Sequence, residues 1–154
     1  MISMRNTLIF LLALTITSAT SSLAIADGGG SSRDSRLAPW QKMIAAEKYE
    51  MAIGELQKAL SKSPDDADVL NLLAYSQRKL LRFDEALVNY QKALQIDPKH
   101  RGANEYLGEL YLQLGQLDKA LERLKVLDDD CFFGCEEFDD LKEAIERYRS
   151  QNAS

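Results

Sequence analysis

The sequence predicts an all-α protein, a short α-solenoid of about three stacked helical hairpins that is closed by a C-terminal capping helix. Ala52, Ala86 and Ala120 recur at an interval of 34 residues, and Pro64 and Pro98 recur at the same interval. Apolar residues around each alanine follow the spacing of one helical face. A fixed period of this length is typical of stacked repeats, in which each unit buries its apolar face against its neighbours.

The middle repeat shows most clearly how a hairpin is encoded. A first helix is predicted over residues 67–80 and a second over 83–96, because apolar side chains line one face of each. Pro98 ends the second helix, since the residue before a proline is driven out of the helical region. Small residues at Ala74 and Ala86 allow the two helix backbones to approach closely. The unit therefore reads as two antiparallel helices.

The outer repeats follow the same plan less closely. In the third unit, residues 101–127, Gly108 takes the place of the small first-helix residue, and Gly115 suits the turn between the helices. In the first unit, residues 37–66, we expect a short first helix that begins near Pro39, because proline is tolerated at a first helical position. We expect the indole of Trp40 to cover the open end of the stack.

Over roughly residues 37–127, this pattern resembles the tetratricopeptide repeat family. The first-helix matches are Leu73-Ala74 and Leu107-Gly108 for the family's Leu-Gly pair and Tyr111 for its aromatic; the second-helix matches are Phe83, Ala86, Tyr90, Ala93 and Pro98. The resemblance implies a concave groove, lined by the first helix of each unit, that binds a protein or peptide.

Groove contacts are expected from first-helix side chains that lie off the apolar stripe. The candidate partner-binding residues are Asn71, Tyr75, Arg78, Glu105, Glu109 and Leu112. Tyr75 suits an interface as an aromatic with a polar tip, and Arg78 can grip a carboxylate with two hydrogen bonds. The clamp by which some cochaperones of this family hold a C-terminal carboxylate is missing, because its positions are occupied by Leu37, Gln41, Leu72, Gly102 and Tyr106.

The N-terminus has the pattern of a secretory signal peptide over residues 1–26. Arg5 precedes an apolar run, and Ala24-Ile25-Ala26 forms a small-x-small cleavage site. An uncleaved anchor is the alternative, but threonine and serine interrupt the run before it reaches the ~20 apolar residues of a membrane span. We expect cleavage after Ala26, a flexible leader over 27–36, a periplasmic or secreted location and no stable membrane insertion afterwards.

The only two cysteines, Cys131 and Cys135, lie in a segment, residues 128–154, that we interpret as a turn and a capping helix. In an exported protein an even number of cysteines favours a disulfide, which would hold the start of a helix over 136–149. We expect Phe132 or Phe133 to pack beneath that helix. An array followed by a cysteine pair, two glutamates and a final helix also resembles the C-terminal caps of bacterial envelope repeat proteins.

Composition and motifs favour a binding module over an enzyme. The net charge is −5 and no basic stripe is present, which disfavours nucleic acid as a partner. The sequence contains no catalytic constellation and no cofactor or metal motif. We expect an exported adaptor for a protein or peptide. Two alternatives stay open, a copper or thiol-redox carrier that uses Cys131 and Cys135, and a structural, homo-oligomeric subunit of an envelope complex.

Overall fold

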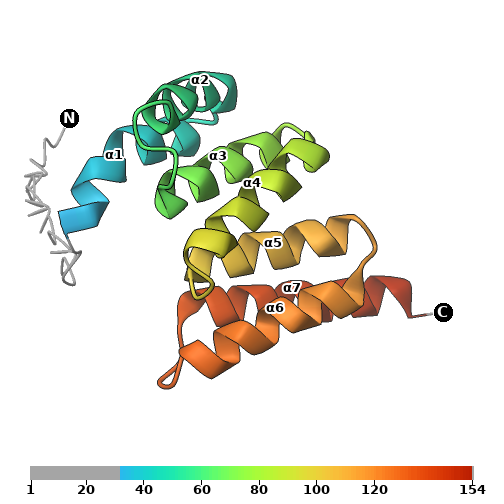
Figure 1. Cartoon of the computed structure of the whole chain (residues 1–154). Helices are drawn as coiled ribbons and strands as arrows, with labels where there is room; N and C mark the ends of the chain where they lie inside the picture. The colour runs from blue at the N-terminus through green and yellow to red at the C-terminus, as the bar shows by residue number, and fades with distance from the viewer. Residues whose placement is uncertain (1–31, 154) are drawn as a thin grey trace, which may run out of the picture. The chain divides into compact units, whose positions relative to one another are not determined.

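The computed structural model describes residues 32–153, and this part of the chain contains seven α-helices and no strand (Figure 1). The predicted all-α class is confirmed; the predicted signal peptide lies outside the described residues. The helices are α1 (Ser32–Ala45), α2 (Tyr49–Leu60), α3 (Ala67–Lys79), α4 (Phe83–Ile96), α5 (Arg101–Gln113), α6 (Leu117–Asp130) and α7 (Glu136–Asn152).

The middle hairpin, α3 and α4, forms where the sequence predicts it. Asp66 caps α3, because its carboxylate accepts a hydrogen bond from the Val69 amide at 3.2 Å. At the other end of the hairpin, Asp97 is extended with φ −130° and ψ 92°, as expected for the residue before Pro98. Ala74 and Ala86 are both fully buried, which permits the close approach of the two helices.

Helix α1 differs from the sequence-based expectation. It runs from Ser32 to Ala45 with Pro39 inside it, so the prediction of a short helix that starts near Pro39 is wrong, as is a leader that extends to residue 36. A proline inside a helix is destabilising, but α1 packs on both α2 and α3, and this packing stabilises the helix by more than Pro39 destabilises it. Leu37 is buried there, and Trp40 packs against the same apolar cluster.

The turn inside each hairpin contains one residue in the left-handed region, and these residues recur at the repeat interval. They are Glu47 with φ 56°, Leu81 with φ 61° and Gly115 with φ 73°. Glycine adopts this conformation freely, whereas a side chain at Cβ makes it unfavourable by about 1–2 kcal/mol. Two of the three turns therefore carry backbone strain that the third avoids.

The first helices stack on one another and build one face of the array. Contacts join α1 to α3, α3 to α5 and α5 to α7, so α7 takes the place of the first helix of a fourth hairpin. Gly108 makes the packing of α7 on α5 possible, since a Cβ at this position would lie 2.6 Å from a methyl carbon of Leu141, which is itself fully buried. The predicted cap is thus a continuation of the stack.

The segment between α6 and α7 also departs from prediction. Helix α6 continues to Asp130, because no proline closes this unit, so residues 128–130 are helical and not part of a turn. Phe132 and Phe133 are 88% and 96% exposed, and the expectation that one of them packs beneath α7 is wrong. Instead Leu141 and Ile145 bury α7 against the array.

Over residues 32–153, none of the helices combines the length and the apolar character that crossing a bilayer requires.

The strained turn at Leu81 makes a prediction about stability. Because Leu81 is 72% exposed, Leu81→Gly removes little contact and relieves the left-handed strain, and it should stabilise the fold by about 0.5–1 kcal/mol. Thermal unfolding should show a melting temperature about 2–5 °C higher. Leu81→Ala is the matched control, since it removes the side chain but keeps the strain. Equal stability of the glycine and alanine variants would contradict the strain argument.

Candidate binding groove

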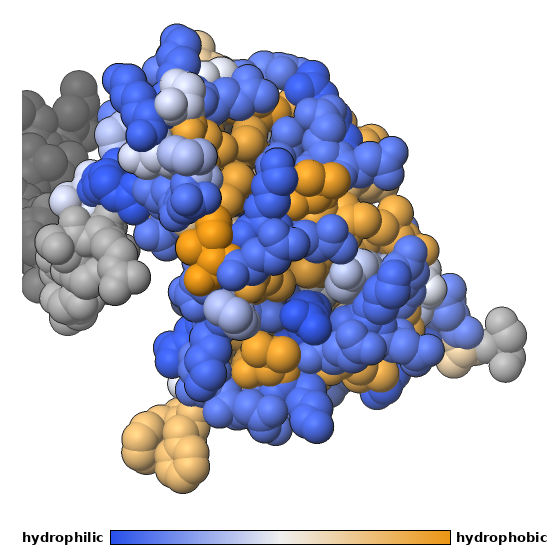
Figure 2. All heavy atoms as spheres, viewed as in Figure 1, coloured by the Kyte–Doolittle hydropathy of each residue, from blue (hydrophilic) through white to orange (hydrophobic). Residues whose placement is uncertain are grey.

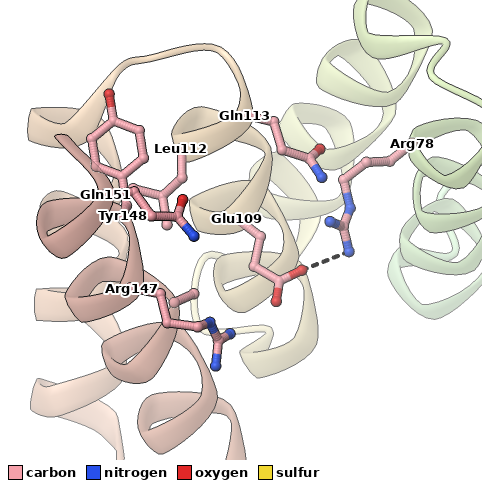
Figure 3. A pocket seen from close by; sticks show the side chains of 8 residues that line it. Arg78, Glu109, Leu112, Gln113, Arg147, Tyr148 and Gln151 are labelled. Atoms are coloured by element: carbon pink, nitrogen blue, oxygen red, sulfur yellow. Dashed lines mark ion pairs between the residues drawn. The ribbon is translucent and has the colours of Figure 1, made fainter.

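A hollow of about 360 Å³ opens on the face formed by the first helices, between α3, α5 and α7 (Figure 3). Its lining combines charged, amide, aromatic and apolar side chains: Arg78, Glu109, Leu112, Gln113, Ala144, Arg147, Tyr148 and Gln151. Figure 3 shows Arg78 and Glu109 facing each other across the α3–α5 interface, while Arg147 and Gln151 reach in from α7. The face is therefore both hollowed and rich in hydrogen-bonding groups.

Arg78 holds α3 to α5. Its side chain is only 7% exposed, and its guanidinium nitrogen lies 2.7 Å from a carboxylate oxygen of Glu109. The same guanidinium lies over the rings of Tyr75 and Tyr106, at 5.3 and 5.7 Å from their centroids. The two rings are in contact with each other, with centroids 4.8 Å apart. A buried, charge-assisted pair of this kind fixes the relative position of the two helices.

Behind this pair, Tyr90 of α4 is fully buried. Burial raises the pKa of its hydroxyl, so the phenol stays protonated, although the neighbouring Arg78 charge acts in the opposite direction. The arginine is thus enclosed by aromatic rings from three helices.

A second hollow, of about 230 Å³, lies next to the first, toward the N-terminal end of the same face. It is lined mainly by apolar and aromatic groups, namely Gln41, Ile44, Ala45, Leu72, Tyr75 and Tyr106. Since Arg78 lines the first hollow and stacks on Tyr75 and Tyr106, it stands between the two. We call the second one the N-terminal hollow.

The six residues predicted from sequence all lie on α3 or α5, but most are covered. Asn71, Arg78, Glu105 and Leu112 are at most 8% exposed, whereas Tyr75 and Glu109 are partly exposed. Arg78, Glu109 and Leu112 come together in the first hollow, and Tyr75 lines the N-terminal hollow. Glu105 and Asn71 line neither of these two. Contact of any of them with a partner stays a prediction.

Sequence reasoning missed the contribution of α7. Arg147, Tyr148 and Gln151 line the first hollow, and none was predicted, because residues 136–149 were interpreted only as a cap. One signal was present. Tyr148 follows Leu114 by one repeat interval, so extending the 34-residue period past residue 128 would have placed a further first helix there.

Glu105 is an ionisable group in an unfavourable place. Burial raises the pKa of its carboxyl to about 8, and the negative charges of Glu109, Asp140 and Glu137 act in the same direction. The nearby guanidinium of Arg78 lowers the pKa, but by less. Near neutral pH the carboxyl is therefore mostly protonated, which avoids an uncompensated buried charge between α5 and α7.

The cysteine pair lies away from the groove. The two sulfur atoms are 2.04 Å apart, at disulfide distance, with Cα atoms 5.6 Å apart. Beside them, hydrogen bonds from Arg101 and Lys99 hold the pKa of Asp130 below its usual range. Among residues 32–153, no three histidine, cysteine, aspartate or glutamate side chains are grouped in a way that could hold a metal ion.

His100, the only histidine, has a structural position at the start of α5. Its Nδ1 accepts a hydrogen bond from the Ala103 amide at 3.1 Å, and its Nε2 lies 3.2 Å from a carboxylate oxygen of Asp68. Because Nδ1 acts as an acceptor, the proton must be on Nε2, which donates to Asp68. Both ring nitrogens are thus occupied by protein groups.

The buried carboxyl of Glu105 predicts a pH-dependent stability. The folded state holds this proton more tightly than the unfolded state, so stability falls as pH rises from about 5 to about 8. Glu105→Gln should remove this loss and raise the melting temperature at pH 8 by about 4 °C or more, with little change at pH 5. Glu146→Gln, on the exposed side of α7, is the control. A Glu105→Gln effect that is equal at both pH values would refute the assignment.

This chain is similar in sequence to known repeat proteins. The tetratricopeptide repeat family matches residues 44–100 and 78–130. The peroxisomal targeting signal receptor of Candida albicans is 36% identical over 80 residues, which make up 52% of this chain and 14% of the receptor. This chain therefore spans only a small part of that relative.

Three solved structures share the fold. The Yersinia enterocolitica type III secretion translocator chaperone SycD has a TM-score of 0.67 at 18% identity over 85% of this chain and 93% of its own. The TPR2B domain of yeast Sti1 has a TM-score of 0.64 at 17% identity, over 78% of this chain and 97% of its own. A tetratricopeptide repeat protein from Parabacteroides merdae has a TM-score of 0.62 at 20% identity, over 73% of this chain and 43% of its own. The two family matches, over residues 44–100 and 78–130, show that this chain contains tetratricopeptide repeats.

Proposed function

We propose that this protein is an exported, non-enzymatic adaptor that binds a protein or peptide in the groove formed by α1, α3, α5 and α7. The observation that carries the proposal is the first hollow, whose lining combines several polar side chains with the apolar Leu112 and Ala144. A concave surface on which several polar side chains converge is the usual first candidate for a binding site. The groove is a continuous feature of the stack, since the helices that line it contact one another in order.

The chemistry of the lining favours an extended peptide as the ligand. Gln113 and Gln151 each offer a donor and an acceptor, which suits the amide and carbonyl groups of a peptide backbone. Arg147, which is exposed and forms an ion pair with Glu143, adds a guanidinium group at the edge. The N-terminal hollow, with its aromatic walls, suits an apolar side chain of the same ligand.

Proteins of similar architecture agree with an interaction role. SycD is described as a translocator chaperone, and the Sti1 domain is described in a complex with pHsp70. Both are similar in fold alone at these identities. They support binding of a protein or peptide as the type of function and do not indicate which one this chain binds.

The proposal also includes export of the protein and a disulfide between the two cysteines. A signal peptide over residues 1–26 would send the mature chain to the periplasm or the medium, where an oxidised Cys131–Cys135 pair is stable. The proximity of the two sulfur atoms supports this pairing. In this role the disulfide joins the end of α6 to the start of α7, which contributes part of the groove.

The groove is tested with a displayed library of random peptides selected on the purified full chain. Peptides that bind should lose about tenfold or more in affinity for Tyr75→Ala and for Arg147→Ala, because these side chains line the two hollows. Arg78→Ala is unsuitable, since it leaves Glu109 without its ion-pair partner and loosens the fold. Lys125→Ala, exposed on α6, is the control, with circular dichroism to verify folding. Selected peptides that bind all three variants equally would place the binding site elsewhere.

Export is tested on the N-terminus of the protein made in a bacterial host with a periplasm. Mass spectrometry of the periplasmic fraction should find a chain that begins at Asp27. Ala26→Lys should block cleavage, because the processing site requires a small residue, and should leave a longer, membrane-associated form. Accumulation of the unprocessed natural sequence in the cytosol would contradict export.

A further inference from the structure

The most exposed apolar group in the described part of the chain is the pair Phe132 and Phe133, which we call the aromatic tip. The two side chains are 88% and 96% exposed, and their rings contact each other edge to face with centroids 5.3 Å apart. Figure 2 shows an apolar knob that projects where the loop between α6 and α7 lies in Figure 1. Two large aromatic side chains held together in water mark an interaction site.

Acidic residues surround the aromatic tip and limit what it can bind. Asp128 and Asp129 precede it and Glu136 and Glu137 follow it, whereas the charge of Asp130 is compensated by Lys99 and Arg101. Residues 128–154 contain nine acidic and three basic side chains, a net charge of −6. This charge repels an anionic membrane surface. The binding site that suits the tip is therefore an apolar recess with basic residues around it.

The N-terminal hollow of this same chain has those properties. Ile44, Leu72, Tyr75 and Tyr106 give it apolar and aromatic walls. Exposed lysines stand on the elements around it: Lys42 on α1, Lys48 in the turn after α1 and Lys79 at the end of α3. The ammonium of Lys79 is 6.0 Å from the centroid of the Tyr75 ring. The three helices that line the hollow, α1, α3 and α5, together carry six basic and four acidic side chains, a net charge of +2.

Within one molecule the aromatic tip does not reach this hollow. No contact joins α1, α2 or α3 to α6 or α7 in the described residues, and the tip lies at the end of the stack opposite α1 (Figure 1). The complementary surfaces therefore lie at opposite ends of one molecule, and only a second copy brings them together.

We propose that the aromatic tip of one copy docks into the N-terminal hollow of another, so that the chain associates head to tail. The inference rests on the proposed function, because the hollow is part of the groove, and it identifies one occupant of that groove. One or two phenyl rings enter the hollow and pack against Tyr75 and Tyr106, while the acidic residues around the tip face the lysines. A contact between two different surfaces of the same chain leads to rings or open chains rather than to closed dimers. Its small area makes it a weak, concentration-dependent association.

The test uses an oxidised synthetic peptide of residues 128–137 and, as receptor, the full chain with Phe132→Ser and Phe133→Ser. Calorimetry should detect binding of the peptide, and affinity should fall with added salt because opposite charges contribute. Tyr75→Ala and Lys79→Glu in the receptor should each weaken binding about tenfold or more; Lys79 is exposed, so its substitution leaves the fold intact. A peptide with serine at both phenylalanine positions should not bind.

Sedimentation velocity provides the second readout. The unsubstituted chain should self-associate as concentration rises, whereas the receptor variant should stay monomeric. Three results would each overturn the proposal. They are a natural chain that stays monomeric, a peptide whose affinity neither receptor substitution changes, and a peptide that binds phosphatidylcholine vesicles equally well. If library peptides bind the groove but the tip peptide does not, the self-docking fails while the proposed adaptor function stands.

Discussion

Close approach of helix backbones at small residues is the constraint on which the whole array depends. Ala52, Ala86 and Ala120 are each completely buried, so none has room for a larger side chain. At Gly108 even one methyl group would collide with Leu141. Because interior packing tolerates little added volume, these positions set the distance between helices and thereby the curvature of the face that the first helices build.

The same constraint sets the position of the C-terminal helix. Since Gly108 admits Leu141 so closely, α7 packs beside α5 in the manner of a further first helix, and its side chains enter the groove. A helix that only covered the end of the array would have left the first hollow without Arg147, Tyr148 and Gln151. The cysteine pair, at disulfide distance directly before α7, lies where it can restrict the start of this helix.

Arg78 and Glu105 are the two charged side chains that are buried in the described residues, and both lie on first helices. Arg78 and Glu109 compensate each other's charge at 2.7 Å, whereas Glu105 reduces the electrostatic cost by keeping its proton. Polar groups of this kind contribute less to stability than apolar ones, but they fix the relative position of α3 and α5. A groove whose walls are held in this way needs little rearrangement to receive a ligand, which lowers the entropic cost of binding.

The sequence by itself determined the all-α class, the interval of the hairpins and the position of α3 and α4, because these depend on local periodicity and on proline and glycine. It did not determine the length of α1, where contacts with α2 and α3 carry the helix through Pro39. Nor did it determine which first-helix residues face outward, since the burial of Arg78 depends on two tyrosines and a glutamate from neighbouring helices. Exposure of Phe132 and Phe133 was likewise decided by the tertiary structure, because Leu141 and Ile145 already fill the space beneath α7.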